Sequence, residues 1–183
     1  MIEEYLDVID EADNVIGCEK RGLIHKTGAL HRGIHVFLFR ADGKLLVQRR
    51  HSNRETEPLA LDCSVSEHVK SGENYRTAAM RGLSEELGIT IVELQPVIKF
   101  RLKYGETDNM ISQLYEGNVE AGMIQMNISE LENIYFFNLD HLLQMIDQDE
   151  DTFSRWFKQL LLWNSGRPSD LEIIVHDSEQ NPS

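Results

Sequence analysis

The sequence predicts an α/β fold in which a mixed central sheet lies between layers of helices. Apolar, strand-like segments are interleaved with two or three segments of helical periodicity, an alternation typical of layered α/β architectures. The chain has 183 residues, of which 41% are hydrophobic, so it can bury one full core. We therefore expect one domain over residues 1–165, followed by a loosely held polar tail over residues 166–183.

A hairpin is expected at the start of the chain. Residues 5–10 alternate apolar and acidic side chains, and Asp13-Asn14 supplies a turn before the returning residues 15–17. Residues 21–27 follow as a short helix or loop. Residues 30–39 then lead into a strongly apolar strand.

A second hairpin follows this strand. Residues 40–44 contain the Asp-Gly pair that favours tight turns, and residues 44–50 return as a strand that ends in Arg49 and Arg50. Arginines at a strand end can hold phosphates by forked hydrogen bonds or pair with surface acids. Both are candidate substrate contacts, and we expect one of them to bind phosphate.

The segment 67–89, EHVKSGENYRTAAMRGLSEELGI, carries the strongest functional signal. Its loop half leads into a helix over residues 73–87, which Gly88 ends. Glu85 and Glu86 point toward the same region of the helix surface. Adjacent ionised carboxylates repel each other unless a cation lies between them, and such oxygen ligands suit Mg²⁺ or Mn²⁺.

This segment resembles a Nudix box, whose pattern is G-x5-E-x7-R-E-U-x-E-E-x-G-U, with U a large apolar residue. The residues that match the pattern without a gap are Glu73, Arg81, Leu83, Glu85, Glu86, Gly88 and Ile89. Two positions depart from it. The leading glycine is replaced by Glu67, and the first glutamate of the R-E step is replaced by Gly82.

The paired departure has two interpretations. If the loop packs against the helix, Glu67 can reach into the space left by Gly82, and the number of carboxylates is kept. A glycine inside a helix costs about 0.5–1 kcal/mol relative to alanine, so another contact should offset it. In the second interpretation the box has lost one functional glutamate, and Glu67 is a solvated loop charge.

The resemblance implies a Nudix α/β/α sandwich and a metal-dependent hydrolase that cleaves a diphosphate linkage in a nucleoside-diphosphate-type substrate. Glu85, Glu86 and Glu67 would act in catalysis and bind Mg²⁺ or Mn²⁺, and His68 would contact the substrate. In the family pattern Glu73 and Arg81 brace the loop against the helix by an ion pair. A further ligand often comes from outside the box, and the candidates are Glu106, Asp108, Glu116 and Glu130.

The remaining elements follow the box. Short apolar runs predict strands at residues 89–92, 97–104, 110–119 and 130–137, of which the second and third form a hairpin. Helices are expected at residues 138–146 and 153–163. The aromatic side chains of the last helix indicate core packing, with a homodimer contact as the second interpretation.

The chain also resembles type 1 isopentenyl-diphosphate isomerase, which implies a second functional class. The positions comparable to that family's metal site are occupied by His31, His25, His68 and the run Gly105–Asp108. The position of the family's catalytic cysteine is Ser66, whose hydroxyl has too high a pKa to replace a thiol. Cys63 would face the other side of the strand. A third class is a binding module whose altered box holds a nucleotide without turnover.

Composition excludes several other classes. The net charge is −13 and no basic run is longer than residues 48–51, so the footprint of a nucleic-acid-binding protein is missing. No apolar run approaches the roughly 18 residues of a membrane span, and the acidic N-terminus has no signal-peptide core. We expect a cytoplasmic protein that acts on a small-molecule diphosphate, with Cys18 and Cys63 reduced.

Overall fold

The structure is a computed structural model that describes residues 3–103 and 109–176. The strands of this part of the chain are β1 Tyr5–Ile9, β2 Val15–Lys20, β3 His31–Phe39, β4 Leu45–Arg50, β5 Leu61–Asp62, β6 Val65–His68, β7 Leu94–Lys103, β8 Asn109–Asn118, β9 Leu131–Phe137 and β10 Glu172–His176. The helices are α1 Arg21–Thr27, α2 Tyr75–Leu87, α3 Leu139–Gln148 and α4 Arg155–Asn164, with a short 3-10 turn at Ala121–Met123.

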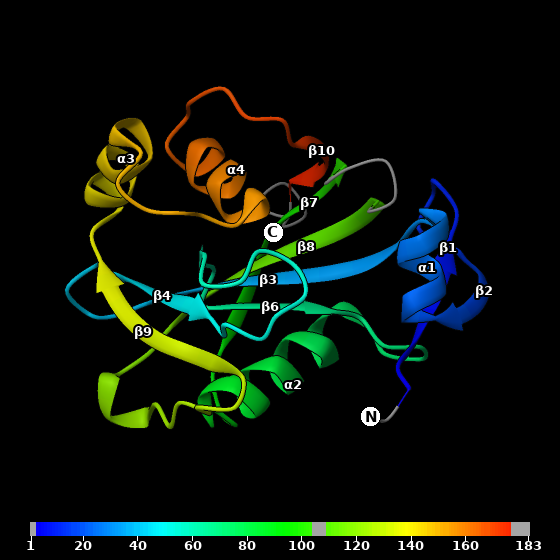
Figure 1. Ribbon diagram of the computed structural model, residues 1–183, viewed down its shortest axis with the longest axis horizontal. Helices are drawn as coiled ribbons and strands as arrows, with labels where there is room; N and C mark the ends of the chain where they lie inside the picture. The colour runs from blue at the N-terminus through cyan, green and yellow to red at the C-terminus, as the bar shows by residue number, and fades with distance from the viewer. Residues whose placement is uncertain (1–2, 104–108, 177–183) are drawn as a thin grey trace, which may run out of the picture.

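A mixed sheet forms the middle layer (Figure 1). Its main path runs β10-β7-β8-β3-β4-β5, while β6 pairs with β3 and β9 pairs with β4. The β3–β8 pair is parallel, whereas β3–β4, β4–β9 and β7–β8 are antiparallel. The predicted mixed α/β fold is therefore confirmed.

Helix α2 covers one face of the sheet. The Asn74 side chain accepts a hydrogen bond from the Thr77 N–H at 2.8 Å and caps its start. At the other end Gly88 adopts the left-handed conformation, with φ 67°, that glycine accommodates without strain. Leu83 and Leu87 belong to the buried cluster on this face, and this packing fixes the rotation of the helix about its axis.

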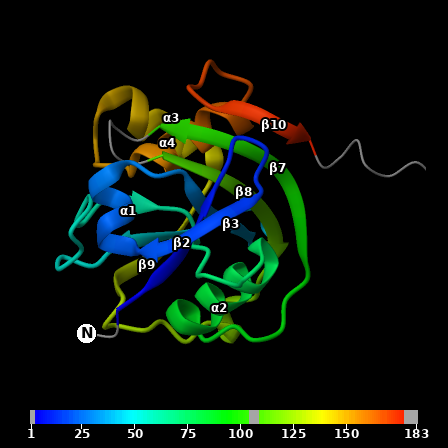
Figure 2. The same ribbon diagram turned by 90° about the vertical axis from the view of Figure 1, so that its right-hand side faces the viewer.

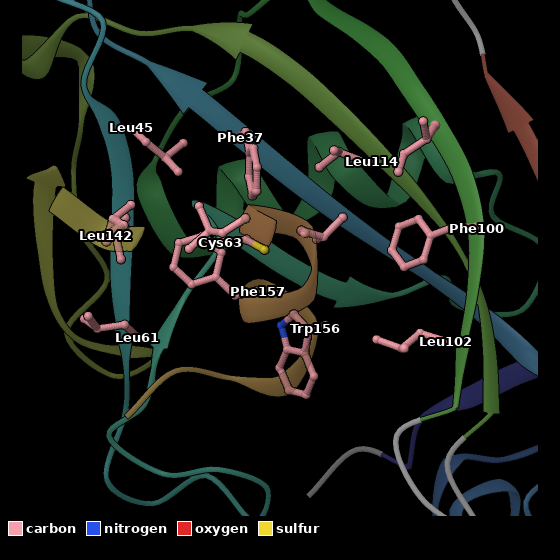
Figure 3. Close-up of a cluster of buried hydrophobic side chains, with 14 of the residues drawn as sticks. Phe37, Leu45, Leu61, Cys63, Phe100, Leu102, Leu114, Leu142, Trp156 and Phe157 are labelled. Carbon is pink, nitrogen blue, oxygen red and sulfur yellow. The ribbon is translucent and has the colours of Figure 1, made fainter. Parts of the chain in front are cut away.

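Helices α3 and α4 cover the opposite face (Figure 1). Trp156 and Phe157 of α4 reach down to Phe37 and Phe100 on the sheet, as Figure 3 shows. Trp156 and Phe157 are buried, and the partly buried Trp163 packs against the same cluster, so the aromatic pattern of this helix reflects core packing.

The N-terminal hairpin β1–β2 and α1 lie together at one end of the sheet (Figure 2). Asp13 in the hairpin turn accepts hydrogen bonds from Arg32 Nε at 2.6 Å, Lys99 Nζ at 2.8 Å and the Tyr75 hydroxyl at 3.0 Å. A second contact joins Asp7 on β1 to the loop before α2. The hairpin therefore contacts both Tyr75, the first residue of α2, and the loop that precedes it.

That second contact consists of two hydrogen bonds. The Ser71 hydroxyl donates to Asp7 Oδ1 at 2.6 Å, and the Gly72 N–H donates to Asp7 Oδ2 at 3.2 Å. The loop between β6 and α2 is thus fixed by residues that lie more than sixty positions earlier in the chain.

The structure differs from the sequence predictions in two segments. Residues 89–92 do not form the predicted strand, because Ile91 is 81% exposed and has no sheet face to cover. Within the expected tail, β10 pairs with β7 as an edge strand, and Leu171 and Ile173 pack against the core. The predicted β7–β8 hairpin is present, but its turn at 104–108 lies outside the described residues.

Two further sequence expectations concern cysteines and membranes. Cys18 is exposed and Cys63 is buried, and both are free thiols. Over the described ranges, no helix is long and apolar enough to cross a bilayer.

Candidate functional site

A cavity of about 290 Å³ lies between α2, β6 and α1. This volume is at the lower end of the range of about 300–1,000 Å³ found for small-molecule sites. Its lining contains carboxylates, basic side chains and histidines from segments far apart in the sequence. The cavity therefore brings together most of the residues selected from the sequence.

Glu67, Glu85 and Glu86 all line this cavity. The Glu86 side chain is 2% exposed, and its Oε2 has no hydrogen-bond partner within the described part of the chain. Burial raises the pKa of Glu86 well above its usual value, and the neighbouring Glu67 carboxylate raises this pKa further. Burial also raises the pKa of Glu67. Glu67 and Glu86 are thus largely buried carboxylates that affect each other's charge, and carboxylate oxygens are ligands that suit a divalent cation such as Mg²⁺.

Glu67 occupies the space beside Gly82. A Cβ atom built on Gly82 would lie 2.6 Å from Val65 Cγ1 and 3.0 Å from Glu67 Cγ. The Glu67 side chain is only 18% exposed, so it is not a solvated loop charge. The geometry supports the first interpretation of the altered box, in which one carboxylate has moved from the helix to the strand that faces it.

Arg81 braces the loop against α2. Its Nε donates to Glu73 Oε1 at 2.9 Å, and its Nη2 donates to the His68 carbonyl at 2.8 Å. Its Nη1 contacts Glu85 at 3.1 Å and Glu67 at 3.4 Å. The ion pair expected between Glu73 and Arg81 is therefore present, and the same guanidinium also holds two of the candidate metal ligands.

The pKa of Glu73 agrees with a structural role. Burial alone would raise this pKa, but hydrogen bonds from Arg81 and from the Lys70 N–H outweigh the effect and lower it. Glu73 therefore remains a carboxylate that accepts hydrogen bonds.

The two arginines at the end of β4 point to different places. Arg49 lies outside the cavity lining, and its Nη2 donates to Asp151 Oδ2 at 2.5 Å. Arg50 lines the cavity and donates to Asp62 Oδ2 at 2.8 Å. Neighbouring residues of a strand face opposite sides, so only one of them can reach the site. Of the two candidate substrate contacts, Arg50 is therefore the one at the cavity, and Arg49 lies away from it.

Arg54 is a site residue that sequence reasoning missed. It lines the cavity, where its Nη2 lies 3.0 Å from Glu130 Oε2 and 3.6 Å from Glu86 Oε1. It belongs to the irregular segment between β4 and β5, where no periodic pattern predicts the direction of a side chain. Arg21 and Lys70 are further basic residues in the lining.

The candidate ligands from outside the box are only partly tested by the structure. Glu130 lines the cavity and pairs with Arg54. Glu116 is half-buried on β8 and is not part of the lining, and burial raises its pKa. Glu106 and Asp108 lie outside the described residues.

His25, His31 and His68 form a cluster in which one possible ligand atom of each lies within 4.8 Å of the other two. The His31 ring is oriented by a hydrogen bond between its Nδ1 and the Ala29 carbonyl at 2.9 Å. Burial lowers the pKa of His68 well below its usual value, so this imidazole is neutral. Imidazoles at this spacing fit a transition-metal ion such as Zn²⁺ or Mn²⁺.

A buried polar network forms another part of the wall. Ser66 Oγ donates to Asp62 Oδ1 at 3.1 Å and lies 3.0 Å from His35 Nδ1. Cys63 is fully buried and is not part of the lining. Burial raises the pKa of its thiol well above the usual value. As expected from strand alternation, the cysteine does not stand in for Ser66.

Comparison with known families gives one match over most of the chain. The NUDIX domain family matches residues 29–157. An uncharacterized Nudix hydrolase of Clostridium acetobutylicum is 39% identical and covers all of this chain and 92% of its own length. An uncharacterized Nudix hydrolase of a Nostoc strain is 30% identical over 93% of this chain and 92% of that protein.

Isomerases and solved structures are also similar to this chain. An isopentenyl-diphosphate Delta-isomerase of Photorhabdus laumondii is 30% identical over 87% of this chain and 92% of that protein. The crystal structure of the protein DR0079 from Deinococcus radiodurans matches with a TM-score of 0.73 and 27% identity, over 86% of this chain and 97% of that chain. A MutT protein from Methanosarcina mazei shares the fold, with a TM-score of 0.63 and 18% identity over 75% of this chain and 94% of that chain.

Proposed function

Because the chain belongs to the Nudix family, we propose that it is a metal-dependent hydrolase that cleaves a diphosphate linkage in a small nucleoside-diphosphate-type substrate. One observation carries the proposal. The carboxylates Glu67, Glu85 and Glu86 share a single cavity with the basic side chains Arg50 and Arg54. A carboxylate set can hold a divalent cation, and the basic set can hold phosphate oxygens beside it.

Each group has a role in this proposal. Glu67, Glu85 and Glu86 would hold Mg²⁺ or Mn²⁺, which when bound neutralises phosphate charge and lowers the pKa of a water molecule. Arg50 and Arg54 bind the diphosphate oxygens and orient the phosphorus toward that water. Attack of a water oxygen on phosphorus, with departure of the bridging oxygen, would require a carboxylate that accepts the water proton. Glu130 is the candidate for this role because it lines the cavity.

A single-turnover assay tests this function. Protein in excess is mixed with nucleotide-sugars, dinucleotides, nucleoside triphosphates and nucleoside diphosphates, first with Mg²⁺ and then with Mn²⁺. We expect cleavage of at least one diphosphate, and we expect Glu86→Gln to abolish it. Glu116→Gln is the matched control, because Glu116 is also a partly buried glutamate but lies outside the cavity lining. Equal activity of the wild type and Glu86→Gln would contradict the proposal.

The histidine cluster supports a second candidate function, that of an isopentenyl-diphosphate isomerase-like enzyme. Ser66 argues against it, since a serine hydroxyl is a poor acid and base for proton transfer at an alkene carbon. The test is incubation of isopentenyl diphosphate with the protein and Mn²⁺ or Zn²⁺. We expect no conversion to the isomeric product, and conversion would favour the isomerase. If no substrate is cleaved or isomerised, the third class, a nucleotide-binding module without turnover, gains support.

A further inference from the structure

We propose that His35 accepts a hydrogen bond from the non-phosphate part of the substrate, so that the cavity selects diphosphates that carry a nucleobase or a sugar over those that carry a hydrocarbon. The inference rests on the proposed function, because the ligand is the diphosphate that the cavity would cleave. Its basis is a part of the lining that the proposed chemistry does not use and that includes His35, Ser66, Met110 and Trp156.

His35 is held rigidly in this wall. It is 3% exposed in the middle of β3. Its ring is stacked near Phe100, with centroids 5.7 Å apart, and near Trp156, with centroids 6.3 Å apart. These two rings limit rotation of the imidazole about its side-chain bonds. The two ring nitrogens therefore keep separate environments.

Asp62 determines which of these nitrogens carries the proton. Asp62 Oδ1 accepts hydrogen bonds from Ser66 Oγ at 3.1 Å, Ser154 Oγ at 2.9 Å and Trp156 Nε1 at 2.5 Å. Because the carboxylate has no proton to donate, the single hydroxyl proton of Ser66 points to Asp62. The Ser66 oxygen then accepts from His35 Nδ1–H, at 3.0 Å.

This chain of hydrogen bonds leaves a lone pair on the other nitrogen. Burial lowers the pKa of His35 to about 4, so the ring is neutral and has one N–H, which Ser66 uses. Nε2 is therefore an acceptor. It is withdrawn from solvent and has no hydrogen-bond partner in the part of the chain that the structure describes. A buried polar atom of this kind requires a partner.

Only some substrates can supply that partner. A nucleobase N–H or a sugar O–H can donate to Nε2, whereas an isopentenyl group has no donor and would leave the acceptor unpaired. Leaving a buried hydrogen-bonding group unpaired lowers affinity by a factor on the order of 10 to 100. A site built to pair such a group discriminates strongly against a ligand that cannot pair with it.

The test measures binding rather than turnover. Affinities for α,β-methylene analogues, which cannot be hydrolysed, are measured by calorimetry with Mg²⁺ for three probes: a nucleoside diphosphate, an abasic ribose 5-diphosphate and isopentenyl diphosphate. We expect His35→Phe to weaken binding of at least one donor-bearing probe about 10- to 100-fold and to leave the isopentenyl probe unchanged. Loss confined to the nucleoside diphosphate indicates a base contact, and equal loss for the abasic probe indicates a sugar contact.

Two further variants complete the design. His35→Gln keeps a side-chain carbonyl acceptor and should restore part of the lost affinity. His141→Phe is the matched control, because His141 also lies beside a phenylalanine ring, Phe137 at 5.6 Å, but outside the cavity lining. Near-ultraviolet circular dichroism of each variant verifies that Trp156 remains packed.

The results that would overturn the role of His35 differ from those that would overturn the hydrolase proposal. Equal weakening of all three probes, no weakening of any, or no binding of a donor-bearing probe to the wild type would each overturn the role of His35. A protein that binds a nucleoside diphosphate analogue through His35 but cleaves no diphosphate would refute the hydrolase function and leave the recognition intact.

Discussion

Glu67 lies against Gly82 so closely that a Cβ atom on the glycine would come within 3.0 Å of Glu67 Cγ. Both residues depart from the box pattern, and their contact relates the two departures. The missing side chain on α2 makes room for the carboxylate of β6, and that carboxylate remains beside Glu85 and Glu86 in the cavity lining. A residue that breaks a local helix preference in this way is expected where function requires it.

A first prediction concerns the stability effect of a methyl group at position 82. Alanine is the better helix former, but its Cβ would lie 2.6 Å from the buried Val65 Cγ1. We expect Gly82→Ala to lower the free energy of unfolding by about 1–3 kcal/mol through overpacking. Gly22→Ala in α1 is the matched control, because no atom lies within 4 Å of that position. The Gly22→Ala control should raise the free energy of unfolding by about 0.5–1 kcal/mol. Urea denaturation measures both, and stabilisation by Gly82→Ala would contradict the packing.

A second prediction concerns exchange of the carboxylate. Val65→Ala first removes the 2.6 Å contact, and Glu67→Gly, Gly82→Glu and the double exchange are then made in that background. We expect both single variants to lose metal-dependent cleavage and the double variant to recover it, because the two sites are coupled. Single-turnover rates measure the coupling. If the rate change of the double variant equals the product of the two single rate changes, the two positions act independently and do not share one carboxylate role.

A third prediction separates Arg54 from Arg49. Arg54 faces Glu86 and Glu130 in the cavity, whereas Arg49 pairs with Asp151 outside it. Arg54→Met should raise KM about 10- to 100-fold, since charge-assisted hydrogen bonds to a ligand contribute about 1.5–3 kcal/mol. Arg49→Met should leave KM unchanged and lower stability by about 0–1 kcal/mol. Steady-state kinetics on both variants measures the difference, and an equal rise in KM would contradict the assignment.

A fourth prediction concerns the brace at Arg81. Its guanidinium contacts Glu73, Glu67, Glu85 and the His68 carbonyl, a set that a single ammonium group cannot reach. Arg81→Lys should lower the free energy of unfolding by about 1–3 kcal/mol. Arg76→Lys on the same helix is the control, because Arg76 makes one hydrogen bond, to the Leu94 carbonyl. Thermal unfolding compares the two, and equal effects would show that the brace adds nothing.

A fifth prediction is a pH dependence caused by His35. Its pKa is lowered from 6.5 to about 4 by burial, so the unfolded chain binds this proton more tightly than the folded chain. Stability is therefore unaffected above pH 6.5 and falls as the pH falls from 6.5 toward 4, by about 3 kcal/mol in total. His35→Phe removes this contribution. Urea denaturation at several pH values measures the free energy of unfolding, which should fall less with decreasing pH in His35→Phe than in the wild type. An equal fall in both proteins would contradict a buried neutral ring.

Most of the fold could be predicted from the sequence because its signals are local. The Asp-Gly turn after β3 and Gly88 after α2 end their elements as expected, whereas α2 begins at Tyr75, two residues later than the sequence predicts. The strand expected at residues 89–92 fails because short apolar runs do not show which residues will be exposed, and Ile91 is exposed. Strand β10 was missed because its pairing partner, β7, lies about seventy residues earlier.

The site was predictable where a motif fixes the spacing and not elsewhere. The shared position of Glu85 and Glu86 follows from helical geometry, the ion pair of Glu73 and Arg81 follows from the resemblance to the box pattern, and the contact of Glu67 with Gly82 follows from their paired departure. Arg54 lies on an irregular loop, so no pattern indicates that it turns toward the cavity. The role of His35 depends on Ser66 and Asp62, which reach it only through the β3–β6 pairing and the fold around it.

We propose that Glu67 restores a complete carboxylate metal site in the altered box. The most direct measurement is an anomalous difference map from a crystal of the wild-type protein soaked with Mn²⁺. We expect a manganese peak within coordination distance of carboxylate oxygens of Glu67 and Glu86, at about 2.0–2.3 Å as for similar divalent cations. A manganese ion bound by Glu85 or Glu86 with the Glu67 carboxylate turned away from it would contradict the claim.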